Sequence, residues 1–317
     1  MPVRPIPFFA SFSALALCAL AASTVRAQEG LDLGASSFQF LKLSLSPRAT
    51  ALGGAGAALA AGVGEAEVNP AAGAFGVKGD QGGSALTVGQ EYPPREFGTS
   101  ASHVSWNLPW DRRRVMLHAR YLGFDDIPGF DDDNNATTAY KAHTLKLQAG
   151  LAGHDFGFDW GGSAAYARNN IADASYSAYL ANAGLRRDLL LGLSAGASVT
   201  NLTLWASQTR ETGETVEPPL ILQAGLGYVR RLSPGSRVAV ALDARRVADE
   251  DVVFPVGAEY QVFEALFIRA GYPVGDPDNG IALGFGLQWS RFGFNYAYKR
   301  HETLSGGHGW TLEIRDL

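Results

Sequence analysis

Hydrophobic residues alternate along most of this chain. From Ser84 onward, apolar side chains recur at every second position rather than every third or fourth. A period of two is typical of β-strands, because successive side chains point to opposite faces of a strand. The pattern predicts fourteen strands, at 83–91, 98–107, 113–123, 141–152, 156–168, 176–186, 189–200, 220–231, 236–246, 252–262, 265–272, 280–290, 292–300 and 307–315.

The side chains on the second face of these strands are small or polar. In 145–152, for example, leucine and alanine alternate with lysine, glutamine and glycine. A soluble β-sandwich usually carries many Lys, Glu and Thr on its outer face. We therefore expect an all-β transmembrane antiparallel barrel of about fourteen strands, whose apolar face meets lipid and whose small face lines a crowded lumen. Aromatic residues near the predicted strand ends fit interfacial girdles: Tyr92, Trp106, Trp110, Tyr121, Trp160, Trp205, Tyr260, Tyr272, Trp289 and Trp310.

The connections between the predicted strands alternate in length. Those after even-numbered strands are short. Outer-membrane barrels have short periplasmic turns and longer extracellular loops, so the N-terminus is expected on the periplasmic side of a bacterial outer membrane. The connections after odd-numbered strands are mostly longer, at 125–139, 169–175, 201–219, 247–251, 273–279 and 301–306.

The first residues resemble an export signal. Arg4 precedes an apolar core from about Phe8 to Ala22, and Val25-Arg26-Ala27 forms a small-residue cleavage site. We expect residues 1–27 to be a signal peptide and exclude them from the fold. The C-terminus departs from a usual barrel, since Ile314-Arg315-Asp316-Leu317 lacks the final aromatic residue of assembly signals.

Between the signal and the strands lies a segment rich in glycine and alanine, Phe38–Phe75. It is too rich in small residues for an ordinary amphipathic helix and too long for a turn. Its position suggests a hatch or plug that enters the barrel from the periplasmic side. The expected domains are a signal peptide at 1–27, a hatch at 28–80 and a transmembrane barrel at 81–317.

Charge and cysteine content narrow the function. Without Arg4 and Arg26, 24 basic residues face 31 acidic ones, a formal charge of −7, which gives no support to nucleic-acid binding. The only cysteine, Cys18, lies in the predicted signal, so a disulfide framework or a thiolate metal site is not expected. After the signal, no run of 18 apolar residues predicts a transmembrane helix.

Several motifs in and after the small-residue segment resemble one known family. In the opening block these are Phe40-Leu41-Lys42, Pro47-Arg48-Ala49, Ala51-Leu52-Gly53-Gly54-Ala55 and Val68-Asn69-Pro70-Ala71. Together they resemble the N-terminal signature of the PorV/PorQ family, a branch of the FadL-type outer-membrane barrels. The similarity extends over the predicted mature chain, whose length is closer to PorQ proteins.

The resemblance implies a fourteen-stranded barrel with the Asn-Pro-Ala turn in a lumenal hatch. FadL carries long-chain fatty acids. PorV and PorQ belong to type IX protein secretion, where PorV receives cargo and PorQ is an accessory barrel. Implied partners are outer-membrane lipid and lipopolysaccharide, and either secretion subunits and cargo C-terminal domains or a hydrophobic ligand. No cofactor is implied.

Two groups of hatch residues are candidates for a site. A guanidinium buried in a barrel needs a carboxylate partner, and for Arg48 the candidates are Glu65, Glu67 and Glu259, with substrate carboxylate binding as the alternative. Asn69-Pro70-Ala71 has the composition of a turn, in which an Asn side chain bonds nearby backbone and Pro fixes the bend. Direct ligand contact by this turn is the alternative reading.

Other motifs have simpler explanations. Gly53-Gly54-Ala55-Gly56 has Leu59 where a dinucleotide loop needs its third glycine, so close backbone approach explains these residues better. The acidic run Asp131–Asn135 lacks the downstream glutamate of a calcium loop and reads as a solvated external loop. The six histidines show no metal spacing or catalytic group; His301-Glu302 with Asp278 is the best cluster, and we expect no enzyme and no metal site.

The sequence thus leaves two functions open. The first is an accessory or cargo-receiving barrel of type IX secretion. The second is a FadL-like conduit for hydrophobic small molecules, in which residues around Arg48 and Asn69 rearrange to admit the ligand. The predicted external loops are short and polar, which favours the first.

Overall fold

The structure is a computed structural model. It describes residues 38–74, 83–130, 135–172, 174–208, 217–248 and 250–317. The predicted signal peptide, the first and last residues of the predicted hatch domain, and Asp131–Asn134 lie outside the described residues.

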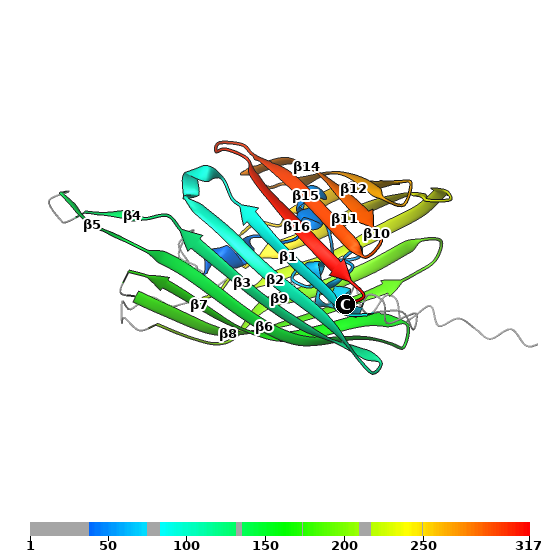
Figure 1. The fold of residues 1–317 in the computed structure, drawn as a ribbon, viewed down its shortest axis with the longest axis horizontal. Coiled ribbons are helices and arrows are strands. Elements are labelled where there is room, and N and C mark those ends of the chain that lie inside the picture. The colour runs from blue at the N-terminus through cyan, green and yellow to red at the C-terminus, as the bar shows by residue number, and fades with distance from the viewer. Residues whose placement is uncertain (1–37, 75–82, 131–134, 173, 209–216, 249) are drawn as a thin grey trace, which may run out of the picture. The chain divides into compact units, whose positions relative to one another are not determined.

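Fourteen antiparallel strands close into a barrel (Figure 1). The last strand pairs with the first, where Ala85 lies opposite Arg315 and Tyr92 opposite His308. The predicted fold class is therefore confirmed. In their order around the wall the strands are β1 (Ala85–Tyr92), β16 (Gly307–Arg315), β15 (Phe292–His301), β14 (Asn279–Trp289), β13 (Leu266–Val274), β12 (Phe254–Val262), β11 (Ser236–Val247), β10 (Ile221–Ser233), β9 (Leu193–Gln208), β8 (Ala174–Asp188), β7 (Phe158–Ile171), β6 (Ala142–Asp155), β3 (Arg113–Phe124) and β2 (Thr99–Trp110).

The two ends of the barrel differ in their connections. At the end called here the short-turn end, strands are joined by brief turns, for example 234–235 and 290–291. The opposite, long-loop end carries longer connections, including 93–98, which contains η4 (Arg95–Phe97), and 248–253. This is the alternation that the sequence predicted, with the three exceptions that follow.

Three predicted loops at the long-loop end were wrong in part. The loop expected at 201–219 begins later, because residues 201–208 extend β9, which pairs with β8 as far as Gln208. The stretch 169–175 was expected as a loop, but its residues pair across β7 and β8 up to Ile171 and Ala174, because the strand backbone can continue through polar side chains that face water. The acidic connection after β3 contains a two-stranded hairpin of β4 (Ile127–Phe130) and β5 (Ala136–Tyr140).

The outer wall of the barrel is apolar. Leu147, Leu242 and Leu283 are 46%, 51% and 47% exposed, and neighbouring strands present similar aliphatic and aromatic side chains. Closure pairs the backbone groups of every strand, which a membrane-spanning sheet requires because hydrocarbon offers no hydrogen bonds. Such a wall fits a lipid environment. Among the described residues, no helix has the length and hydropathy needed to span a bilayer.

The N-terminal segment, defined here as Phe38–Ala74, contains four short helices. These are η1 (Gln39–Lys42), α2 (Pro47–Ala51), η2 (Val63–Glu65) and η3 (Pro70–Ala74). Helix α2 contacts β13 to β16, η2 contacts β1 and β2, and η3 contacts β3, β6, β7 and β8. Since these strands surround the barrel, the segment lies within the lumen, as the blue ribbon in Figure 1 shows.

Glycines on the inner wall let the segment's backbone come close. A Cβ added at Gly161 of β7 would meet the carbonyl of Pro70, and one at Gly196 of β9 would meet the carbonyl of Ala57. These strands therefore carry glycine where the segment passes, because any side chain would push the segment from the wall. The small side chains that the sequence predicts on the inner face therefore lie where the segment packs against the wall.

This contact predicts unequal effects for two adjacent glycines of β7. Gly161→Ala places a methyl group against the backbone of Pro70, and overpacking of this kind costs about 1–3 kcal/mol. Gly162→Ala is the matched control, because its added Cβ would have only Asn182 O, at 3.8 Å, within 4 Å. Limited proteolysis of the detergent-solubilised barrel should cut the segment faster in the first variant. Equal cleavage rates would contradict the packing.

Candidate functional site

An ion-pair network joins the N-terminal segment to the barrel wall. Ser46 caps α2 by accepting a hydrogen bond from the Ala49 N–H at 3.1 Å, and Pro47 occupies the first helical position. The next residue is Arg48. Its Nε donates to Glu259 Oε2 of β12 at 2.7 Å, and its Nη1 donates to Glu65 Oε2 at 2.8 Å.

Glu259 is the centre of this network. Its side chain is 1% exposed and also accepts a hydrogen bond from Arg269 Nε of β13 at 2.7 Å. A third guanidinium, that of Arg237 on β11, lies 3.6 Å from the same carboxylate. The wall therefore surrounds one carboxylate with cations before the segment is added, and Arg48 attaches the segment to that carboxylate.

Burial and the neighbouring carboxylates shift the pKa of Arg48 in opposite directions. Burial tends to lower the pKa of this guanidinium, but attraction to Glu65 and Glu259 outweighs burial and raises the pKa above its ordinary value. Arg48 therefore stays charged in the lumen. Of its three sequence-predicted candidate partners, the structure brings Glu65 and Glu259 to it.

The third candidate, Glu67, was wrong as a partner of Arg48. It contacts Lys146 Nζ of β6 at 2.9 Å and His118 Nε2 of β3 at 3.1 Å. The reason is direction, because Glu65 turns back into the segment, where it meets Ser46 and Arg48, whereas Glu67 turns toward β3 and β6 of the wall. Burial opposes ionisation of Glu67, but attraction to His118 and Lys146 outweighs it and holds the pKa of Glu67 well below its usual range.

The Asn69-Pro70-Ala71 turn lies against β8. Asn69 Oδ1 accepts a hydrogen bond from the Ala71 N–H at 3.0 Å. Its Nδ2 donates to the carbonyls of Ala57, at 2.7 Å, and of Leu185 on β8, at 3.2 Å. The side chain thus closes the turn, ties two parts of the segment together and fixes both to the wall.

Gly53 and Gly54 form a tight bend after α2, with φ values of +72° and +94°. Such backbone angles favour glycine. A Cβ on Gly53 would meet the backbone of Tyr272 at 2.6 Å, and the Gly54 carbonyl accepts a hydrogen bond from Gln223 of β10 at 2.9 Å. The bend packs directly on β10 and β13.

Sequence reasoning missed Asp243 of β11. Its Oδ2 accepts hydrogen bonds from the backbone N–H groups of Gly56 and Ala57, both at 2.8 Å, and from Gln223 Nε2 at 2.6 Å. A lone acidic residue on the small inner face of a predicted strand was the available signal. It holds the glycine-rich bend as Glu259 holds Arg48.

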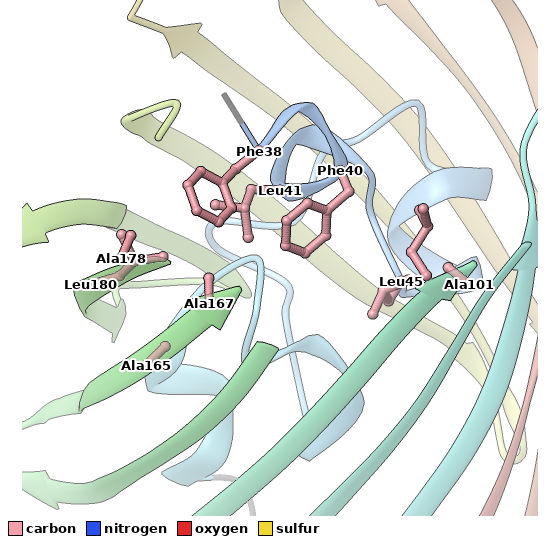
Figure 2. Packing of buried hydrophobic residues seen from close by; sticks show 10 residues of the cluster. Phe38, Phe40, Leu41, Leu45, Ala101, Ala165, Ala167, Ala178 and Leu180 are labelled. Atoms are coloured by element: carbon pink, nitrogen blue, oxygen red, sulfur yellow. The ribbon is translucent and has the colours of Figure 1, made fainter. Parts of the chain in front are cut away.

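Phe40 belongs to an apolar cluster toward the long-loop end of the lumen. Figure 2 shows Phe38, Phe40 and Leu41 of the segment facing small and aliphatic residues of β7 and β8. Arg120 of β3 lies over the Phe40 ring, 5.2 Å from its centroid. The buried members of the cluster are Phe38, Phe40, Leu41, Leu45, Ala101, Leu122, Ala165, Ala167, Ala178 and Leu180.

The best histidine group in the sequence does not assemble a catalytic arrangement. His301 Nδ1 accepts from the backbone of Leu304 at 3.2 Å, and Glu302 and Asp278 meet through a backbone hydrogen bond. Within the part of the chain that the structure describes, no group of three His, Cys, Asp or Glu residues could hold a metal ion.

Comparison with solved structures identifies similar folds. The chain resembles the Pseudomonas putida toluene transporter TodX (TM-score 0.59, 12% identity) and the Ralstonia pickettii toluene transporter TbuX (0.57, 14%). It also resembles a Pseudomonas aeruginosa FadL homologue (0.50, 11%). Each alignment covers 86% of this chain and 98% of the other. No protein-family model and no curated protein sequence matches.

These neighbours share the fold of FadL-type outer-membrane barrels, and those named as transporters are not enzymes. A closed fourteen-stranded barrel with an apolar outer wall is the architecture of proteins that cross the bacterial outer membrane as strands. The predicted location, the bacterial outer membrane, is confirmed.

Removing the central carboxylate should loosen the whole network. Glu259→Gln leaves Arg48 and Arg269 without their shared anion, and breaking a buried ion pair on one side costs about 3–5 kcal/mol. Glu302→Gln is the matched control, since Glu302 forms an exposed pair with Arg300 at 3.5 Å. Urea unfolding in detergent should show a large loss for the first variant only. Equal midpoints would disprove the central role of Glu259.

The pKa of Glu67 also predicts a pH dependence. Because the folded pKa lies well below the ordinary value of 4.5, ionised Glu67 stabilises the fold above about pH 4.5, and this contribution is lost as pH falls toward the folded pKa. Glu67→Gln should flatten the decline in urea midpoint between about pH 5 and pH 3, whereas Glu302→Gln should leave the decline unchanged. A Glu67→Gln curve as steep as that of the parent protein would count against this assignment.

Proposed function

We propose that this barrel is a conduit for small hydrophobic molecules and that its N-terminal segment acts as the hatch. The observation that carries the proposal is the enclosed apolar cluster between the segment and β7–β8. In a lumen lined mainly by small and polar residues, this cluster brings together the aromatic rings of Phe38 and Phe40, and such apolar surface favours an apolar solute over water.

The position of the cluster supports inward passage. Its wall residues Ala101 and Leu122 lie near the ends of β2 and β3 that adjoin the longer connections. By the rule for outer-membrane barrels these connections face outward. A hydrophobic molecule arriving from outside therefore reaches Phe38 and Phe40 before the ion pairs deeper in the lumen.

Opening the hatch means exchanging polar contacts between the segment and the wall. Arg48, Asn69 and the glycine-rich bend are each held by a small number of hydrogen bonds to wall residues. Because these contacts are separate from one another, they can be exchanged in steps, whereas the paired strands around the segment stay closed.

The similar solved structures support a conduit over the alternative. Two of them are named as toluene transporters, and we extend that activity class to this chain as a proposal. The motifs around Arg48 and Asn69 resemble the PorV/PorQ family, so a role in type IX secretion is the second candidate. The sequence favoured that role because the predicted external loops are short, but the fold comparisons favour the conduit.

Uptake by whole cells tests the proposal. The full chain is expressed in a bacterial host lacking its own hydrocarbon channels, and uptake of labelled toluene and of a labelled disaccharide is measured. We expect faster toluene uptake and unchanged disaccharide uptake. No gain in toluene uptake, with secretion subunits or cargo C-terminal domains recovered on purification from the native membrane, would instead support the secretion role.

The apolar cluster predicts which variant impairs uptake. Phe40 is 6% exposed, so Phe40→Asn puts an amide into the apolar route, where an unpaired polar group costs about 1–3 kcal/mol. Toluene uptake should fall at least about fivefold. Phe156→Asn, in a short turn where the ring is 98% exposed, is the matched control and should leave uptake unchanged. Equal rates for both variants would argue against passage through the cluster.

A further inference from the structure

A cavity lies beside the ion-pair network, on the side away from the apolar cluster. It has a volume of about 450 Å³, within the range of about 300–1,000 Å³ of small-molecule sites. Its roof is the N-terminal segment around Arg48 and Glu65. Glu264, in the turn between β12 and β13, also lines it, so the cavity lies toward the short-turn end of the barrel.

The charges at the roof of this cavity do not balance. Three guanidiniums, those of Arg48, Arg237 and Arg269, surround only two carboxylates, those of Glu65 and Glu259. Arg48 and Arg269 take the short contacts of 2.7–2.8 Å. Glu264 also lines the cavity, but among the described residues no ion pair joins it to Arg237, whose one carboxylate contact is the longer one to Glu259, so Arg237 is the least neutralised of the three guanidiniums.

Arg237 is placed to bind an anion in the cavity. Its side chain is 40% exposed and lies 3.6 Å from Glu259, beyond a charge-assisted hydrogen bond of about 2.7–2.9 Å. Among the described residues, its Nε is buried without a hydrogen-bond partner. The guanidinium therefore has donors to spare, and a carboxylate is the group that matches its planar fork.

One side of this largely polar cavity offers apolar contacts for the body of such an anion. Phe267 of β13 lies under Arg237, with 5.9 Å between the guanidinium carbon and the ring centroid. Leu59 of the segment and Val229 of β10 line the same space. Aromatic rings pair favourably with Phe at centroid distances of about 4.5–7 Å.

From this arrangement we propose that the cavity binds a small aromatic carboxylic acid, with its carboxylate on Arg237 and its ring beside Phe267. This site extends the ligands of the proposed conduit from neutral hydrophobic molecules to aromatic acids. It rests on the proposed function only for the route by which such a ligand reaches the cavity. A neutral hydrocarbon has nothing to offer Arg237 and is not retained.

Direct binding to the purified full-length barrel in non-ionic detergent tests the site. Isothermal titration with benzoate should give saturable binding that weakens at high salt, because exposed charges are screened. Benzyl alcohol, a neutral probe of similar size, should bind at least about tenfold more weakly, as expected when a charge-assisted hydrogen bond is absent. Equal affinity for the two probes would overturn the proposal.

Variants locate the site. Arg237→Gln should weaken benzoate binding at least about tenfold, and Arg237→Lys, which keeps the charge but not the fork, should weaken it less. Arg300→Gln is the control, because Arg300 is exposed at the opposite end of β15. Heat-modified mobility on gels verifies that each variant is folded. If Arg237→Gln does not fold, unchanged affinity in Arg237→Lys together with insensitivity to salt would overturn the proposal.

The outcomes separate this site from the conduit. Benzoate binding that depends on Arg237 without toluene uptake would leave the acid site standing and remove the conduit. Toluene uptake without benzoate binding would leave the conduit standing and remove the acid site.

Discussion

A carboxylate that is almost fully buried needs cations around it. Glu259 has arginines from both the barrel wall and the N-terminal segment. The neighbouring strand β13 supplies Arg269, and the N-terminal segment supplies Arg48. The same carboxylate thus completes the wall and holds the segment in the lumen. Without it, two guanidiniums would repel each other at the point where the segment meets β12 and β13.

The lumen has two different chemistries on either side of this network. Toward the long loops, Phe38 and Phe40 meet alanine and leucine of the wall. Toward the short turns, arginines and glutamates line a polar cavity. A solute that crosses the barrel must leave an apolar environment and enter a charged one, so the ion pairs between Arg48 and Glu259 stand where the change occurs.

Much of the fold follows from the sequence, because a period of two persists through each strand. The hairpin β4–β5 and the paired residues near Ile171 escaped prediction, since polar strand residues that face water do not alternate. The segment was harder to predict. Glu65 and Glu67 are equivalent in sequence, and only the irregular turn between them directs one to Arg48 and the other to Lys146. Asp243 gave no sign of its partners, which are backbone groups far along the chain.

We propose that the segment Phe38–Ala74 is a hatch that yields to a hydrophobic solute while the barrel stays closed. Hydrogen–deuterium exchange of the purified barrel, measured by mass spectrometry with and without saturating toluene, tests this most directly. Toluene should speed the exchange of amides in residues 38–74 and leave the exchange of amides in the paired strands unchanged. Exchange in the segment that is as slow as in the strands and indifferent to toluene would contradict this proposal.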